Sequence, residues 1–230
     1  MWALAVCAVA AAGYLDGWRR SGLSFFDFFE RKAMYLFARI WHRCAPANDP
    51  LPVLGPAIVV ANHPCHADPA FLLASCRRVL HFLQARECYD IPVLRRLFAR
   101  GGCIPVKREG TDIAGIRRAL HDLEQGAVLG IFPEGDVTPS HHVSIRAAKP
   151  GTALLALRSH APVYPAWIAG GPRGRDLLHA WLWPSRGVRV VFGPPVDLRR
   201  YYDRPINHQL LQEVSGAVAR GIAELGAKNE

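Results

Sequence analysis

Several sequence features that mark other classes of protein are missing from this chain of 230 residues. Its six cysteines include no Cys-x-x-Cys pair, and none follows Cys103, so the last 127 residues hold no cysteine. This distribution does not suit a disulfide framework and indicates a reduced compartment. No second cluster at zinc-ligand spacing accompanies His63, Cys65 and His66, so we expect neither a metal site nor a cofactor.

Long hydrophobic runs are also missing. Residues 2–15 are apolar, but Asp16 and the pair Arg19 and Arg20 end this stretch before the roughly 20 residues that a membrane span needs. A cleaved signal peptide would carry its cations before the apolar stretch, whereas here they follow it. We therefore expect a retained anchor or a re-entrant helix.

Negative charge is in short supply. The chain has 28 lysines and arginines against 19 acidic residues, which gives a formal net charge of +9. Such an excess favours a partner that bears phosphate. The basic residues are scattered rather than interleaved with aromatic residues, so nucleic acid is not expected and membrane lipid is favoured.

Residues 24–44 combine apolar side chains near helical spacing with cations, which is typical of a helix lying in a membrane interface. An amphipathic helix packed on the protein's own core is the alternative. We favour lipid because of the apolar stretch upstream, and divide the chain into a membrane-anchoring helical segment at 1–45 and one domain at 46–230. The pattern is carried by Phe25, Phe29, Leu36, Phe37, Ile40 and Trp41, with Arg31, Lys32, Arg39 and Arg43.

The remainder alternates short β-branched runs with stretches of helical spacing, which predicts an α/β fold with a mixed central sheet flanked by helices. Thr111 and Asn207 are candidate N-caps for two of the helices. The predicted strands are 57–61, 79–83, 103–106, 128–132, 163–168 and 188–192, and the predicted helices are 68–77, 91–100, 112–125, 151–160 and a C-terminal helix from 207.

Polar side chains follow the first predicted strand, where ligands gather in such sheets. Asn62-His-Pro-Cys-His-Ala-Asp-Pro69 places a histidine five residues before an aspartate. A carboxylate that orients the imidazole would allow His63 to deprotonate an alcohol, with Asp68 as its partner. Asp68 as a plain helix N-cap is the alternative. His66 is the weaker candidate base, because Phe71 stands where its aspartate would be.

Two later strands also end in polar residues. Residues 102–108 end in the cations Lys107 and Arg108, and Phe-Pro-Glu-Gly at 132–135 follows another apolar run. Each has an alternative interpretation, as a solvated pair of cations or as a turn whose glycine supplies a positive φ.

These polar blocks resemble those of the glycerophosphate and lysophospholipid acyltransferase family, to which 1-acylglycerol-3-phosphate acyltransferases belong. The resemblance extends over residues 50–170 and keeps the order of the family's blocks. It is carried by Asn62, His63 and Asp68, by the glycine-to-arginine block at 102–108, by Phe-Pro-Glu-Gly at 132–135 and by a proline-centred strand at 161–165.

The resemblance implies a role for each site residue. His63 is then the general base and Asp68 its orienting partner, with no covalent acyl-enzyme. Arg108, Glu134 and Gly135 bind the glycerol-phosphate part of the acceptor, with Lys107 as a further substrate-binding cation. A guanidinium fork suits phosphate. A glutamate cannot bind phosphate directly, so we expect Glu134 to accept a hydrogen bond from a glycerol hydroxyl or to hold Arg108.

The resemblance also implies the reaction, which takes place at the cytoplasmic face of the cell membrane. An acyl group passes from acyl-CoA or acyl-carrier protein to the hydroxyl of a lysophospholipid, expected to be 1-acyl-sn-glycerol 3-phosphate, giving phosphatidic acid. Asp136 and Val137 stand where the family usually has threonine and arginine, so a cation expected near the acceptor is missing. Arg146 or Lys149 could replace it. Another lysolipid, or another hydroxylated or amine-bearing lipid, is the alternative acceptor.

Two functions of other classes compete with this interpretation. A thiol hydrolase would use Cys65 as nucleophile, with His63 or His66 as its base. A non-catalytic membrane-binding protein would explain the N-terminal segment, but it leaves the polar blocks at the strand ends without a role.

Overall fold

The structure of the chain, a computed structural model, describes residues 25–108, 112–138, 148–172, 177–185 and 187–229. The apolar stretch at 2–15, the candidate cap Thr111 and the substitute cation Arg146 lie outside these residues. The anchor or re-entrant helix therefore stays a prediction.

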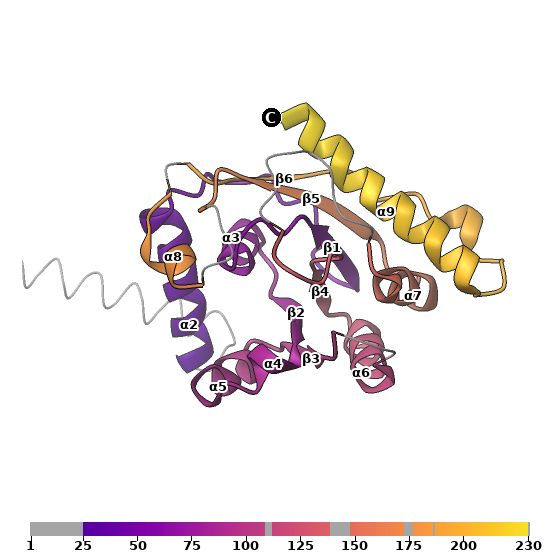
Figure 1. Cartoon of the computed structure of the whole chain (residues 1–230), viewed down its shortest axis with the longest axis horizontal. Helices are drawn as coiled ribbons and strands as arrows, with labels where there is room; N and C mark the ends of the chain where they lie inside the picture. The colour runs from indigo at the N-terminus through magenta and orange to yellow at the C-terminus, as the bar shows by residue number, and fades with distance from the viewer. Residues whose placement is uncertain (1–24, 109–111, 139–147, 173–176, 186, 230) are drawn as a thin grey trace, which may run out of the picture.

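One central sheet of six strands, in the order β3-β2-β4-β1-β5-β6, organises the fold (Figure 1). The first five strands in that order pair in parallel, and β6 is antiparallel to β5. The sheet is thus mixed, as predicted. The strands are β1 Ala57–Ala61, β2 Leu80–Ala85, β3 Ile104–Val106, β4 Val128–Ile131, β5 Val163–Ala169 and β6 Arg189–Phe192.

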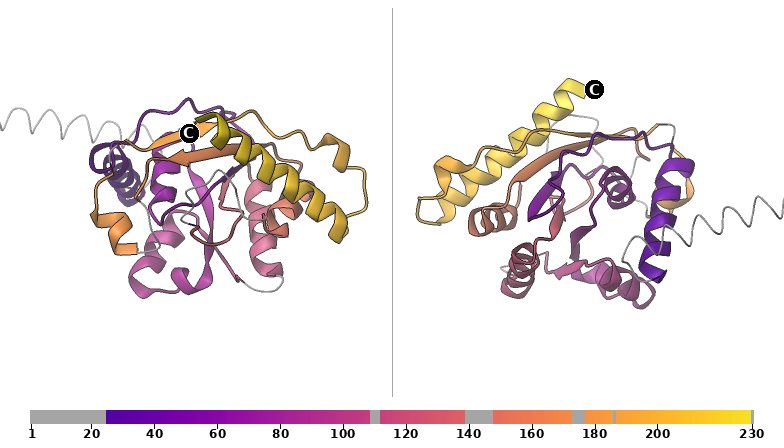
Figure 2. Two further views of the ribbon diagram at one scale, coloured as in Figure 1. Left: turned by 45° about the horizontal axis from the view of Figure 1, so that its top comes forward. Right: turned by 180° about the vertical axis from the view of Figure 1, so that it is seen from behind.

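Helices cover both faces of this sheet (Figures 1 and 2). On one face η1, α3 and α8 contribute to a core cluster, and on the other face α6, α7 and α9 contribute to a second. The helices are α2 Phe25–Leu36, η1 Phe37–Trp41 (a π-helix), α3 Asp68–Ser75, α4 Arg86–Tyr89, α5 Pro92–Arg100, α6 Ile113–Glu124, α7 Pro150–Ser159, α8 Leu177–Leu182, η2 Arg199–Tyr201 (a 3-10 helix) and α9 His208–Asn229.

The central strand β1 shows why the sequence folds this way. All five of its residues are buried, because helices cover the sheet on both sides. Val59 packs into the cluster with α3, whereas Ile58 and Val60 pack into the cluster with α9. This alternation is the two-residue period of a strand. The parallel pairing of β1 with β4 and β5 then places the polar turn after Ala61 at the carboxyl edge of the sheet.

The starts of α6 and α9 had candidate N-caps in the sequence, and the predicted start of α6 needs correction. The side chain of Asn207 accepts a hydrogen bond from the backbone N–H of Leu210 at 2.9 Å, which confirms it as the cap of α9. The helix predicted at 112–125 begins one residue later, because Asp112 is itself the cap and accepts a bond from the backbone N–H of Gly115 at 2.9 Å.

The segment predicted to lie in a membrane interface forms α2 and the single π-helical turn η1. Phe28 and Ala38 are buried toward the core, so the alternative of packing on the protein's own core holds for part of its surface. Most of its other large apolar side chains are exposed, including Phe29, Ile40 and Trp41 at 54%, 69% and 46%. Across the described ranges, no helix combines the length and apolarity required to cross a membrane.

Candidate active site

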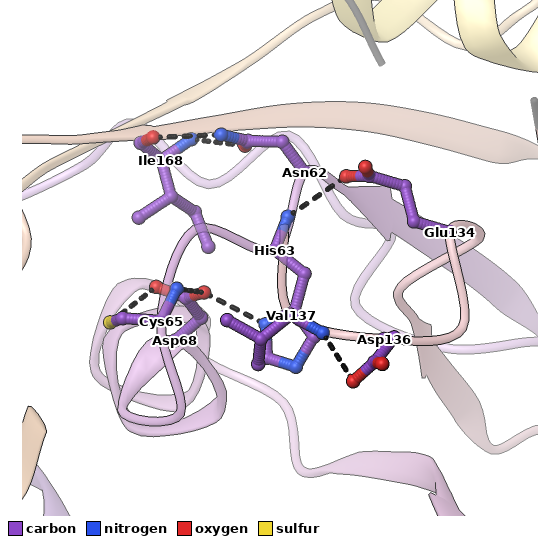
Figure 3. Close-up of polar contacts among 8 residues, drawn as sticks. All are labelled: Asn62, His63, Cys65, Asp68, Glu134, Asp136, Val137 and Ile168. Atoms are coloured by element: carbon purple, nitrogen blue, oxygen red, sulfur yellow. Dashed lines mark hydrogen bonds and ion pairs between the residues drawn. The ribbon is translucent and has the colours of Figure 1, made fainter. Parts of the chain in front are cut away.

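The turn between β1 and α3 brings His63 and Asp68 together (Figure 3). Nδ1 of His63 lies 2.8 Å from Oδ2 of Asp68, whose side chain is fully buried. Because a carboxylate only accepts hydrogen bonds, Nδ1 carries the proton and the lone pair of Nε2 is left for chemistry. Asp68 is the first residue of α3. The cap position is held by Ala67, and no side chain caps this helix. The N-cap interpretation of Asp68 is therefore wrong.

The carboxylate of Asp68 receives two further hydrogen bonds from Cys65. The backbone N–H of Cys65 donates to Oδ2 at 2.8 Å, and its thiol donates to Oδ1 at 3.1 Å. Burial, followed by the charge of Asp68, raises the pKa of the Cys65 thiol above its ordinary value. The thiol is thus a donor that holds Asp68 rather than a thiolate nucleophile. This geometry argues against the thiol-hydrolase hypothesis.

The block at 132–135 holds the histidine in place. The ring of Phe132 stacks on the ring of His63, with centroids 4.0 Å apart and planes at 16°. The backbone N–H of His63 donates to Glu134 at 3.4 Å, and the backbone N–H of Thr138 donates to the carbonyl of His63 at 2.9 Å. This contact of Glu134 with the turn after β1 was not predicted from the sequence, which assigned Glu134 to a glycerol hydroxyl or to Arg108.

The structural role of Asn62, the residue before His63, was not predicted from the sequence (Figure 3). Its side-chain amide donates to the carbonyl of Ile168 at 2.9 Å and accepts from the N–H of Ile168 at 2.7 Å. The buried amide thereby continues the pairing of β1 with β5 beyond the last strand residue. The signals for it in the sequence were its position directly before His63 and its place in the first block of the family resemblance.

The cations after β3 are placed by Asp112, the cap of α6. The backbone N–H of Lys107 donates to the Asp112 carboxylate at 2.7 Å. The N–H groups of Gly115 and Lys107 together lower the pKa of Asp112 from its ordinary value. Arg108, the next residue, pairs through Nη1 with Asp136 at 3.2 Å and through Nε with Glu87 at 3.6 Å.

Lys149, one of the two substitute cations, lies beside the block at 132–135. Its backbone N–H donates to the carbonyl of Pro133 at 2.8 Å. Gly135 has φ +73°, a backbone conformation that favours glycine, and the side chain of Lys149 packs over it.

A cavity of about 350 Å³ lies between the turn after β1, the end of β3 and the block at 132–135. His63, Lys107, Arg108 and Gly135 all line it, so the structure brings four of the six predicted site residues to one space. The other two, Asp68 and Glu134, contact His63 without lining the cavity. Further lining residues are His66, Asp136 and Lys149, and the apolar side chains of Phe82, Val106, Ile116, Ile131, Leu154 and Leu211.

Within the described part of the chain, no group of three or more histidine, cysteine or acidic side chains is placed to hold a metal ion. A base, several cations and an apolar wall suit a substrate that has a hydroxyl, an anionic group and a hydrocarbon chain.

Three relatives and a family model match the chain. The model, described as Acyltransferase, matches residues 45–169. N-acylphosphatidylethanolamine synthase of Arabidopsis thaliana is 30% identical over 162 residues, 62% of this chain and 56% of that protein. 1-Acyl-sn-glycerol-3-phosphate acyltransferase of Bacillus subtilis is 24% identical over 149 residues, 65% of this chain and 70% of that protein. A probable enzyme of the same name from Mycoplasma genitalium is 28% identical over 153 residues, 60% of this chain and 55% of that protein.

The chain thus spans little more than half the length of two of these relatives. A solved structure, the 1-acyl-sn-glycerophosphate acyltransferase PlsC of Thermotoga maritima, matches with a TM-score of 0.63 and 22% identity, over 95% of this chain and 89% of that chain. This likeness shows a shared fold. The family model covers 125 of the 230 residues, from 45 to 169, and includes every predicted site residue. The chain belongs to the acyltransferase family.

Proposed function

We propose that this protein transfers a fatty acyl group from a thioester, acyl-CoA or acyl-carrier protein, to the hydroxyl of a lysophospholipid. The observation that carries the proposal is the His63–Asp68 pair, 2.8 Å apart, at a cavity that is also lined by Arg108 and by apolar side chains. A base, a ligand for phosphate and a surface for hydrocarbon are the three groups that the reaction needs.

In the proposed reaction His63 acts as general base. Nε2 takes the proton of the acceptor hydroxyl while the oxygen attacks the thioester carbonyl. The tetrahedral intermediate collapses, the carbon–sulfur bond breaks, and the proton on His63 passes to the departing sulfur, which leaves as a thiol. Asp68 stabilises the imidazolium that exists between these two proton transfers. No acyl-enzyme is formed, in keeping with a Cys65 thiol held against Asp68.

Arg108 is the proposed ligand for the acceptor's phosphate, since a guanidinium forms paired charge-assisted hydrogen bonds with it. Lys107 and Gly135 complete the phosphate end of the cavity. The acceptor expected from the sequence, 1-acyl-sn-glycerol 3-phosphate, would give phosphatidic acid, and two of the relatives bear the corresponding name. It is the first acceptor to test.

We also propose that the protein docks on the cytoplasmic face of the cell membrane. Figures 1 and 2 show α2 and α8 side by side, and the ring of Phe37 in η1 stacks on Trp181 in α8 with centroids 4.7 Å apart. Exposed apolar side chains on these helices and the residue after α8 form an apolar docking surface, and nearby cations suit anionic lipid. This surface consists of Phe25, Phe29, Leu36, Ile40, Trp41, Leu177, Leu178, Leu182 and Trp183.

The proposed acyl transfer is tested with purified protein, a labelled acyl thioester and lysophospholipids in detergent micelles. His63→Ala should reduce the rate by about 100-fold or more, the scale of a lost general base. Cys65→Ala should leave most of the activity, because the thiol only supports Asp68. Circular dichroism and thermal unfolding serve to show that both variants are folded. Loss of activity in Cys65→Ala with retention in His63→Ala would restore the thiol-hydrolase hypothesis.

A further inference from the structure

The charge around Arg108 is mixed rather than purely positive. Its guanidinium lies 3.2 Å from the Asp136 carboxylate and 3.6 Å from that of Glu87. Arg108 and Asp136 both line the cavity that contains His63. An acceptor phosphate that reaches Arg108 therefore arrives beside a carboxylate.

Asp136 is held where it meets the acceptor. One of its carboxylate oxygens accepts a hydrogen bond from the backbone N–H of Val137 at 2.8 Å, and Val137 is itself buried. The carboxylate is thus fixed to the same loop that contains Gly135 and that binds the backbone of His63 through Thr138. The side chain is 49% exposed, and this bond together with the ion pair to Arg108 favours its position beside the cavity.

Lys149 adds a second cation on the other side of the loop. Its side chain runs across Gly135, and Nζ donates to the carbonyl of Arg108 at 3.2 Å. Lys149 also lines the cavity. The cavity therefore presents Arg108 and Lys149, with Lys107 as a third cation, and a carboxylate beside Arg108.

Two kinds of lysolipid head group respond differently to this pattern. A phosphomonoester has a charge of about −1.5 to −2 at pH 7, so it is strongly attracted by the cations but repelled by Asp136. A phosphodiester that ends in an ammonium group has a single negative charge for Arg108 and Lys149 and a cation for Asp136. It complements all three side chains, whereas the phosphomonoester complements only two.

We propose that Asp136, with Arg108 and Lys149, selects a lysophospholipid whose phosphate carries a primary ammonium group, the phosphoethanolamine class, over one that ends in a phosphomonoester. This inference rests on the proposed acyl transfer and makes 1-acyl-sn-glycerol 3-phosphate the weaker acceptor. An ammonium paired with a carboxylate keeps its proton and is not a nucleophile. The acyl group therefore goes to the glycerol hydroxyl, and the product is an ester rather than an amide.

The test compares two acceptors with the same acyl chain, lysophosphatidylethanolamine and lysophosphatidic acid, at equal mole fraction in nonionic detergent micelles with one acyl-CoA. We expect wild-type protein to favour the ethanolamine lipid in kcat/KM by about twofold to fivefold, the scale of one partly exposed ion pair. Asp136→Asn should abolish this preference, by slowing the ethanolamine lipid and accelerating the phosphomonoester, while Asp136→Glu should retain it. Lys149→Met should weaken both acceptors.

The matched control is Asp197→Asn, because Asp197 also forms an ion pair with an arginine, Arg199, at 2.9 Å but does not line the cavity. It should leave the preference unchanged. Equal or better use of the phosphomonoester by wild type, an unchanged preference in Asp136→Asn, or an amide product by mass spectrometry overturns the inference. If neither lipid is acylated by wild type, the proposed function itself fails.

Discussion

At the scale of single residues, Asp68 connects the proposed base to the turn around it, since its buried carboxylate receives hydrogen bonds from His63 and from both the backbone and the thiol of Cys65. Replacement by asparagine keeps the size of the side chain but presents an amide that can donate to Nδ1. The imidazole would then carry its proton on the wrong nitrogen. This residue therefore determines which nitrogen of His63 is free to act.

We expect Asp68→Asn to reduce kcat by about 100-fold to 10,000-fold, because the wrong tautomer removes the base. Steady-state acylation rates measure the effect. Asp122→Asn is the matched control, since Asp122 forms a similar pair with His81 at 2.9 Å outside the cavity. A drop of the same size in the control would mean that lost folding, not a lost tautomer, explains the result.

The raised pKa of Cys65 leads to a second prediction. A thiol whose pKa lies above its ordinary value stays protonated at neutral and mildly alkaline pH, and the protonated form is not alkylated. Iodoacetamide at pH 8 should therefore modify Cys88, which is partly exposed at the cavity, well before Cys65. Peptide mass spectrometry measures both sites. In denaturant the two should react alike, and equal labelling of the folded protein would contradict the assigned burial.

At this scale the sequence predicts identities better than contacts. His63 and Asp68 were identified because a histidine and a carboxylate follow a buried strand, and the structure places them within hydrogen-bond distance. The contact between Glu134 and His63 joins residues 71 positions apart. No local pattern encodes such a contact, because it depends on β1 and β4 being neighbours in the sheet.

At the scale of elements, the strand positions were predicted to within about two residues, and the largest shift has a tertiary cause. The strand predicted at 79–83 is observed as Leu80–Ala85. Its last residues, from Leu83 to Ala85, pair with β3. The hydrophobic pattern predicts an early end for this strand, because Gln84 is polar. Pairing with β3 extends β2, and the sequence does not show that β3 is its neighbour.

The short helix α8 was not predicted at all, although it contributes to the apolar docking surface that we propose. Leu182 and Trp183 are 63% and 64% exposed. Replacing both with serine should weaken binding to phospholipid vesicles by about tenfold or more, since each large apolar side chain contributes up to about 1.5–3 kcal/mol when fully buried. Vesicle flotation measures the effect.

The control for this prediction is Leu54→Ser, because Leu54 is 84% exposed on the loop before β1 and is not part of the apolar docking surface. It should bind vesicles as wild type does. Unchanged binding in the double α8 variant would exclude α8 from the membrane contact and leave α2 and η1 as its candidates.

At the scale of the whole molecule, we expect the net charge of +9 to act together with the proposed apolar docking surface. We expect binding to vesicles containing anionic phospholipid to weaken steeply as salt rises toward about 1 M, where the Debye length falls to about 3 Å. Binding to neutral vesicles should be weaker and nearly independent of salt. Flotation over a salt series measures both. Salt-independent binding to anionic vesicles would show that apolar contacts alone hold the protein.

The overall fold was accessible to sequence reasoning because strand and helix periods alternate so regularly along the chain. Fold class and the ends of most strands follow from that alternation. The charge pattern of the cavity does not. Asp136 was read in the sequence as the loss of an expected cation, whereas the structure pairs it with Arg108, 28 positions away in the chain. Its effect on the acceptor depends on that partner.

The bonds between Asn62 and Ile168 have a consequence for the newly made protein. They tie the start of the catalytic turn to a residue synthesised 106 positions later. At ordinary elongation rates that interval lasts roughly 5 to 20 s, and β1 has no β5 to pair with until it is over. An unfinished chain thus has its histidine and its aspartate but not the frame that aligns them. A chain that stops before Ile168 can pair β1 with β4, but it lacks the bonds that hold Asn62, so we expect such a fragment to be inactive.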